Sequence, residues 1–122
     1  MIVVNLNDSR PFITRDGSRI RSILDRTNAP VRNQSLAEAT LPPGSATDGH
    51  RHPHTEEIYY VLSGSAAMTV GAESRDLKPL DAVLIPPGAY HRIVNTGSTP
   101  LVFLCCCAPP YSHDDTAMEP GA

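Results

Sequence analysis

Two histidines and a glutamate stand close together in residues 44–64, which read GSATDGHRHPHTEEIYYVLSG. His50 and His52 are separated by one residue, and Glu57 follows five positions after His52. Imidazole and carboxylate groups hold divalent iron, manganese, cobalt, nickel, copper or zinc while leaving coordination positions open. The three residues therefore predict a metal site with chemistry on a bound ion, although a pair of histidines alone is more often part of a solvated loop.

The spacing of the three residues requires an interruption in the chain. Alternation along an extended segment places His50 and His52 on one side and Glu57 on the other. Pro53 lacks a backbone donor and biases the residue before it away from helix. We therefore expect a bulge or a short turn between the histidine pair and a strand that begins near Glu57, so that all three side chains can meet.

The rest of the chain is typical of short strands joined by tight turns. Its 12 prolines are poorly compatible with a helical bundle. Turn residues recur at the spacing of about 8 to 12 residues that is found in sandwiches and barrels. Residues 18–24 have apolar side chains at helical spacing but are short enough for a strand, so both alternatives stay open. The expected strands are residues 1–7, 34–41, 57–62, 66–70, 75–77, 82–85, 91–95 and 101–107.

The expected strand at residues 57–62 is apolar or aromatic on both faces, which is typical of a strand buried on both sides. If Glu57 points into a barrel, then Ile58, Tyr60 and Leu62 form an apolar row on the outside. A second sheet or a partner chain must cover such a row. The sequence thus predicts a homodimer, to whose partner sheet the N-terminal strand could add.

Composition limits the classes of partner. The 122 residues are enough for one domain, and the net charge of −3 comes without a dense cluster of lysine or arginine, which argues against nucleic acid. There is no apolar run of membrane-spanning length, and the first 30 residues are charged, so we expect a cytoplasmic chain with no membrane partner. The adjacent Cys105, Cys106 and Cys107 do not resemble a disulfide framework, and we expect small buried groups in a reducing compartment.

Residues 44–95 resemble the two motifs of the cupin superfamily. The first motif is matched without a gap by Gly44, His50, His52, Glu57 and Gly64. The second motif has Leu80 in place of its opening glycine, a departure that affects a turn and no ligand. The remaining positions of the second motif are filled by Pro86, Gly88, His91 and Asn95.

The resemblance implies an all-β fold, a double-stranded β-helix or jelly-roll barrel. It implies one cupin domain over residues 1–122, with a barrel core at about 34–107, an N-terminal strand and connecting segment at 1–33 and a C-terminal tail at 108–122. It also implies one divalent transition metal ion (Fe, Mn, Ni, Co, Cu or Zn) inside the barrel. The implied ligands are His50, His52, Glu57 and His91. His54 and Glu56 are expected at the solvated rim.

The resemblance further implies a metal-dependent enzyme acting on a small-molecule substrate. We expect first an oxygenase that activates dioxygen beside a chelating oxygen-donor substrate. The alternatives are a non-redox isomerase, epimerase, decarboxylase or lyase that uses the ion as Lewis acid, and a cupin that binds a sugar or a small acid without catalysis. Candidate groups beside the ion are Tyr59, Asn95 and Glu38. Their structural alternatives are core packing, a turn and a solvated strand carboxylate, respectively.

The tail allows two interpretations. Pro109 and Pro110 are stiff enough to carry Tyr111 and His113 across the mouth of a barrel, where the tail would act as a lid. The acidic and turn-forming residues 114–121 pack poorly, however, and favour a frayed terminus.

Overall fold

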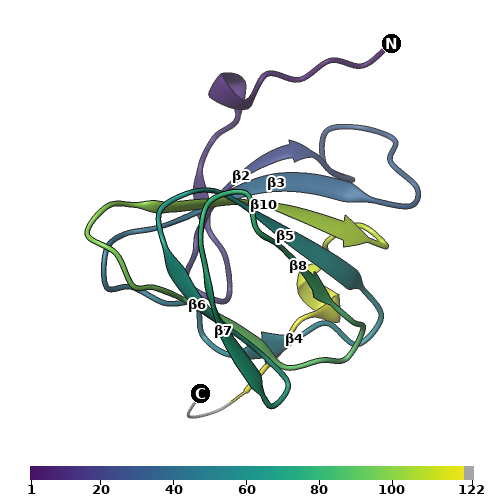
Figure 1. Ribbon diagram of the computed structural model, residues 1–122. Coiled ribbons are helices and arrows are strands. Elements are labelled where there is room, and N and C mark those ends of the chain that lie inside the picture. Colours follow the sequence, from purple (N-terminus) through teal and green to yellow (C-terminus); the bar gives the residue numbers. More distant parts are fainter. Residues whose placement is uncertain (120–122) are drawn as a thin grey trace.

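The computed structural model describes residues 1–119, and nearly all of its regular structure is β-strand (Figure 1). One antiparallel sheet contains, in spatial order, β1 (Phe12–Ile13), β2 (Arg19–Leu24), β3 (Ser35–Leu41), β10 (Leu101–Ala108), β5 (Glu56–Ser63) and β8 (Ala82–Ile85). The other contains β11 (Ala117–Met118), β4 (His50–Arg51), β9 (His91–Asn95), β6 (Ala66–Val70) and β7 (Glu73–Leu77). The all-β prediction is confirmed, and residues 18–24 form a strand.

The two sheets enclose one apolar core. β10 lies between β3 and β5 in the first sheet, and Phe103 on β10 pairs with Ala39 and Val61 on these neighbours. All three side chains are buried, together with Ile93 on β9 of the opposite sheet. Burying an apolar side chain of the size of Phe103 or Ile93 contributes roughly 1.5–3 kcal/mol. This core holds β5 and β9 face to face, and both strands carry residues of the predicted metal site.

The N-terminal strand predicted at residues 1–7 is wrong. Residues 1–5 have no strand assignment, and Leu6–Asp8 form a short 3-10 helix, η1, in which the Asn5 side chain accepts a hydrogen bond from the Asn7 amide at 2.9 Å. Ile2 and Val3 favour extended backbone by their branching, but a strand also needs a ladder partner. Within residues 1–119 no strand pairs with this segment, and the Val3 side chain is largely exposed.

β5 is buried on its inner face only. Glu57, Tyr59 and Val61 point into the barrel, whereas Ile58 and Leu62 are 42% and 39% exposed. The expectation that this strand is buried on both sides is therefore wrong for the single chain, since the described residues place no second layer over the outer face. The apolar sequence on both faces reflects a core on one side and an uncovered apolar row on the other.

The backbone conformation of two turns explains which residues can occupy two of the motif positions. Gly64 has a φ of +89°, and a Cβ there would lie 2.8 Å from the Pro100 carbonyl oxygen, so only glycine fits. Leu80 has a φ of +75°, the left-handed conformation that glycine adopts at little cost and other residues adopt at a cost of about 1–2 kcal/mol. The leucine therefore keeps the turn of the glycine it replaces.

The tail is ordered through Glu119, and the frayed-terminus interpretation is wrong for residues 109–119. A second 3-10 helix, η2 (His113–Asp115), follows β10, and β11 then pairs with β4 through Ala117 with Arg51 and Met118 with His50. Residues 120–122, which include the predicted poorly packing Pro120 and Gly121, lie outside the described residues. The tail runs across one end of the barrel next to β4 (Figure 1).

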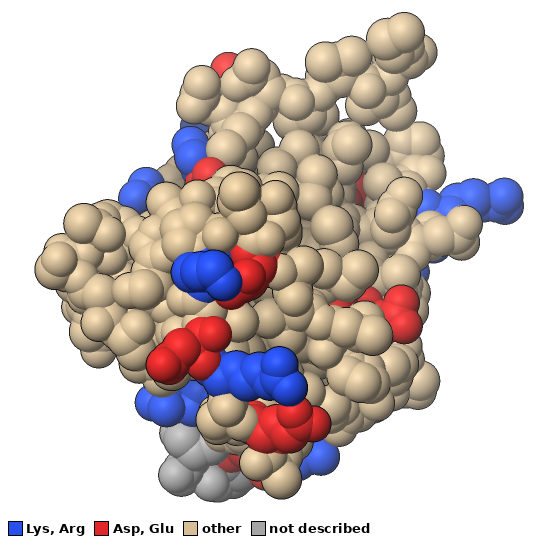
Figure 2. Space-filling view, viewed as in Figure 1, with Lys and Arg blue, Asp and Glu red and all other residues tan. Residues whose placement is uncertain are grey.

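The surface carries both signs of charge. Figure 2 shows basic and acidic side chains interspersed over one face, so that among the described residues no patch of one sign extends across it. Within residues 1–119, no helix has the length and apolar character needed to cross a membrane.

Candidate metal centre

The structure brings the four predicted ligands together inside the barrel. His50 on β4 is the register partner of His91 on β9, and His52 follows β4 directly. One ring nitrogen from each of these histidines lies within 4.8 Å of the other two. Glu57 enters from β5 of the opposite sheet, and its Oε1 lies 3.3 Å from His52 Nε2 and 3.5 Å from His91 Nε2. All four residues are buried.

The chain brings Glu57 to the histidines by changing sheets. β4 ends at Arg51 in one sheet, and β5 begins at Glu56 in the other, with Pro53 in the connection. The His52 carbonyl accepts a hydrogen bond from the Gly88 amide at 2.8 Å, which fixes the start of this connection. The predicted interruption is present, and of the two expected forms it is a short connection, which here crosses from one sheet to the other.

Backbone carbonyls orient all three imidazoles. A carbonyl oxygen can only accept a hydrogen bond, so each histidine Nδ1 that contacts one carries the proton and leaves the Nε2 lone pair free. The carbonyls and their distances from Nδ1 are Asp48 for His50 at 2.8 Å, Ala89 for His91 at 3.0 Å and Asp115 for His52 at 3.1 Å. With Nδ1 used in this way, the three Nε2 atoms face one point and are available to bind an ion.

Two polar atoms at this point lack hydrogen-bond partners. Glu57 Oε1 and His91 Nε2 are completely buried, and neither makes a hydrogen bond within residues 1–119. Buried polar atoms are normally satisfied, because leaving one unpaired costs about 1–3 kcal/mol. A divalent cation would satisfy both atoms at once, so the residues present fit a metal ion.

The surroundings of Glu57 favour the ionised form of its carboxylate. Burial alone would raise the pKa of Glu57, but the nearby His52 and His91 outweigh it and hold the pKa at about 2. Burial also opposes the charged form of His52, yet Glu57 raises the pKa of this imidazole. Burial and the neighbouring His91 lower the pKa of His50. The centre therefore offers one carboxylate with imidazoles, a donor set suited to a divalent transition metal.

Cys107 forms a hydrogen bond with the Glu57 carboxylate oxygen that does not contact the histidines. Its thiol is buried and donates to Glu57 Oε2 at 3.1 Å, which leaves Oε1 to face the histidines. Burial, and then Glu57, raise the pKa of this thiol, so it stays protonated and able to donate. Cys105 faces the same interior but is only partly buried, and Cys106 is exposed on the opposite face. The expectation that all three are buried is therefore correct for Cys107 alone.

Of the three candidates for a role beside the ion, Tyr59 alone faces the cavity. Its ring is buried, with its centroid 6.0 Å from that of His91 and 4.7 Å from that of Phe103, and burial raises the pKa of the phenol. Asn95 instead fixes a turn, because its amide donates to the Leu41 and Thr99 carbonyls and accepts from the Gly97 amide. Both interpretations of Tyr59, packing and ligand contact, are compatible with its position.

Glu38, His54 and Glu56 lie away from the centre. Glu38 is on the face of β3 opposite to the core residue Ala39, where it pairs with Arg21 at 2.7 Å. It is buried, so the expected solvated carboxylate is replaced by an ion pair on the outside of the sheet. His54 and Glu56 are exposed, as expected for the rim, and His54 contacts the Asp115 carboxylate.

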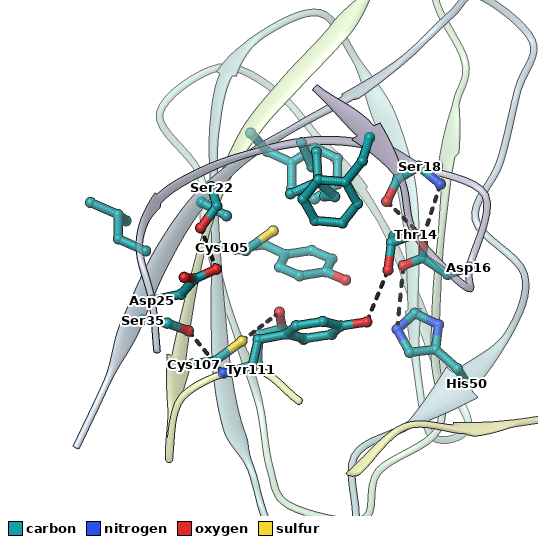
Figure 3. Close-up of a pocket in the computed structure, with 18 residues that line it drawn as sticks. Thr14, Asp16, Ser18, Ser22, Asp25, Ser35, His50, Cys105, Cys107 and Tyr111 are labelled. Carbon is teal, nitrogen blue, oxygen red and sulfur yellow. Dashed lines mark hydrogen bonds and ion pairs between the residues drawn. The ribbon is translucent and has the colours of Figure 1, made fainter. Parts of the chain in front are cut away.

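The structure adds a carboxylate that the sequence did not reveal. Asp16 lies in the turn between β1 and β2 and is 9% exposed. Its Oδ1 accepts hydrogen bonds from the Ser18 amide and hydroxyl at 2.9 and 2.6 Å, and its Oδ2 lies 3.5 Å from His50 Nε2 (Figure 3). The Asp-Gly-Ser sequence at 16–18 is a recognisable turn signal, but nothing local indicates that the turn reaches the barrel mouth.

A small cavity of about 50 Å³ adjoins the centre and is lined by 18 residues (Figure 3). Part of its lining comes from residues 14–18 and from Tyr111, and we refer to the segments 14–18 and 111–116 as the clasp. The Tyr111 hydroxyl lies 2.9 Å from Thr14 Oγ1, and Arg15 donates to the carbonyls of His113 and Thr116 at 3.1 and 3.2 Å. We therefore expect ligand access to the centre to depend on whether the clasp is closed.

Comparison with known proteins agrees with this geometry. Residues 37–107 match the family described as the cupin domain. The chain is 49% identical over 109 residues to an uncharacterized protein, MJ1618, of Methanocaldococcus jannaschii, covering 89% of this chain and 87% of that protein. It is 29% identical to the tetracenomycin polyketide synthase protein TcmJ of Streptomyces glaucescens, with 88% and 75% covered.

Among solved structures, a predicted oxalate decarboxylase from Thermotoga maritima superimposes with a TM-score of 0.77 at 27% identity, covering 88% of this chain and 98% of that one. This similarity confirms the predicted jelly-roll barrel.

Proposed function

The chain belongs to the cupin family, and from this premise we propose that it is a metal-dependent enzyme acting on a small molecule. The observation that carries the proposal is the convergence of three histidine Nε2 atoms and Glu57 Oε1, two of them buried without partners. In this proposal the ion is held by His50, His52, Glu57 and His91. When bound, it would supply Lewis acidity or dioxygen activation to a ligand that chelates through oxygen.

The protein's own residues keep this centre in one geometry. Backbone carbonyls hold the imidazoles, and Cys107 holds Glu57, so the donors need no rearrangement on binding. In this proposal Tyr59, whose phenol stays protonated, would donate a hydrogen bond to a ligand oxygen in the cavity. The apolar wall formed by residues such as Phe103 and Ala39 excludes water, which strengthens each polar interaction inside.

We favour an oxygenase, and a non-redox decarboxylase, isomerase or lyase is the second candidate. The structural similarity to a predicted oxalate decarboxylase supports this second candidate, because that protein has the same fold at 27% identity. Both candidates use the same four ligands. They differ in whether dioxygen is consumed, so one measurement separates them.

The test is metal analysis of protein purified without added metal, followed by an oxygen-uptake screen over catechols, flavonols, diketones and 2-oxo acids. Oxygen uptake with one of these classes is the expected result for an oxygenase. Substrate loss without oxygen uptake would favour the non-redox candidate. A protein that takes up none of iron, manganese, nickel and zinc would contradict the enzyme proposal in either form.

We also propose that the whole chain acts as one cytoplasmic cupin domain and forms a homodimer. The outer row of β5 supports the dimer: Ile58 and Leu62 are 42% and 39% exposed, and Leu84 on the neighbouring β8 is 57% exposed. The apolar arm that contains Ile2 and Val3 has no strand partner within residues 1–119. Contiguous apolar surface of this kind is usually covered in an oligomer.

Replacing Ile58 by glutamate should convert the dimer to a monomer, because the dimer would have to bury an unpaired charge. Sedimentation at micromolar concentration is the measurement. Glu73→Gln on exposed β7 is the control and should stay dimeric. A wild-type protein that sediments as a monomer would rule the dimer out.

A further inference from the structure

The cavity beside the centre is lined by acidic side chains, without lysine or arginine. Asp16, Asp25 and Glu57 are among its 18 lining residues, and none of these described residues is lysine or arginine. We propose that Asp16 selects ligands that are uncharged when they enter and that carry neighbouring hydroxyl and carbonyl oxygens, such as hydroxyketones, enediols or hydroxamic acids. Small dianions, dicarboxylates in particular, are disfavoured. This inference rests on the proposed metal centre and adds the class of its ligand.

The position of Asp16 resembles that of Glu57 relative to the imidazoles. Asp16 Oδ2 lies 3.5 Å from His50 Nε2, and Glu57 Oε1 lies 3.3 and 3.5 Å from the Nε2 atoms of His52 and His91. An ion held by His50 would lie about 2.0–2.1 Å from its Nε2 atom, and therefore within about 6 Å of the Asp16 carboxylate. A ligand oxygen in the cavity on the ion would therefore lie next to this carboxylate.

Asp16 cannot turn away from an incoming anion without loss of its own contacts. Its Oδ1 accepts two hydrogen bonds from Ser18, and its carbonyl accepts one from the Asp48 amide at 2.7 Å. The residue is 9% exposed, so water screens its charge weakly. Oδ2 is the oxygen that remains to face the cavity and His50 (Figure 3).

Charge balance then separates two kinds of ligand. A divalent ion with Glu57 has a net charge of about +1, and Asp16 cancels this remaining charge. A dianion would make the buried centre strongly negative, which is costly at low dielectric. An uncharged ligand avoids this cost, and its hydroxyl can donate a hydrogen bond to Asp16 Oδ2.

The experiment compares two small chelators on the metal-loaded protein. Oxalate is a dianion at pH 7, and acetohydroxamic acid is of similar size and uncharged. Metal content is measured first, and the dissociation constant of each chelator is then measured from the visible spectrum of the Co²⁺-loaded protein. We expect wild type to bind acetohydroxamic acid at least about tenfold more tightly than oxalate, and Asp16→Asn to tighten oxalate binding about tenfold, for one buried charge removed.

Asp76→Asn makes the same change in net charge at an exposed position on β7 and should leave both constants unchanged. Tighter binding of oxalate by wild type, an unaltered ratio in Asp16→Asn, or no binding of either chelator to loaded protein would overturn this inference and leave the metal centre intact. Failure of the wild-type protein to take up Co²⁺ would instead contradict the metal centre itself.

Discussion

Replacing His91 by alanine should remove the stabilisation that a divalent ion gives to the protein. His91 is fully buried, and its Nε2 has no hydrogen-bond partner in the described part of the chain, so the proposed ion would be its partner. Loss of a group that only orients a ligand typically costs 10- to 100-fold in metal affinity, so loss of the donor itself should cost about 100-fold or more. An ion at 100 times its dissociation constant stabilises the folded state by about 2.7 kcal/mol. For a chain of this length, that corresponds to a rise in Tm of roughly 10 °C.

The measurement is Tm with and without added ion, together with metal content after dialysis. Wild type should show the rise, and His91→Ala should not, whatever the Tm of its metal-free form. His54→Ala is the matched control, since this histidine side chain is 82% exposed and lies at the rim. Equal metal content in wild type and His91→Ala would show that the four residues are not the ligands.

Truncation after Pro110 should weaken metal binding about tenfold or more while the barrel still folds. The deleted segment supplies the Asp115 carbonyl that accepts from His52 Nδ1, and it supplies Thr116, whose hydroxyl lies 3.2 Å from the same nitrogen. Removing both leaves His52 free to rotate, at the cost usual for an orienting partner. The core strands β3 to β10 keep their pairings, so circular dichroism should still report a folded β protein.

Metal titration and chelator binding on the truncated chain are the measurements. Asp114→Ala serves as control, because this side chain is exposed and should affect neither. Unchanged affinity for both ion and chelator after truncation would show that the tail has no role in binding either of them. The structure adds to the lid hypothesis that the tail also orients His52, one of the proposed ligands.

The residues of the candidate centre could be picked out from the sequence because the pattern that identifies them is local. His50, His52 and Glu57 lie within eight residues of one another, and His91 lies in a second short motif. Motif spacing is set by turns such as that at Gly64, which leave a recognisable residue behind. The alternation along each strand likewise indicated which residues of β5 face inward.

The remaining features depend on contacts between distant segments. Asp16 and Asp115 reach the centre only because the turn at residues 16–18 and the 3-10 helix η2 lie at the barrel mouth. No neighbouring residue in the sequence indicates that either aspartate contacts a histidine of the centre. The N-terminal strand was predicted from the β-branched Ile2 and Val3, but pairing is a tertiary property, and the described part of the chain offers no partner. Propensity alone therefore gave the wrong element there.

The clasp has a consequence for the order of events along the folding pathway. Thr14 and Tyr111 are 97 positions apart, and Arg15 and Thr116 are 101 apart. Closing so long a loop has an entropic cost that is recovered only after the intervening strands have paired, so the clasp forms last and opens first. Such local opening requires less free energy than global unfolding. We therefore expect the exchange rate of an ion or ligand to be set by the rate at which the clasp opens, independently of how stable the barrel is.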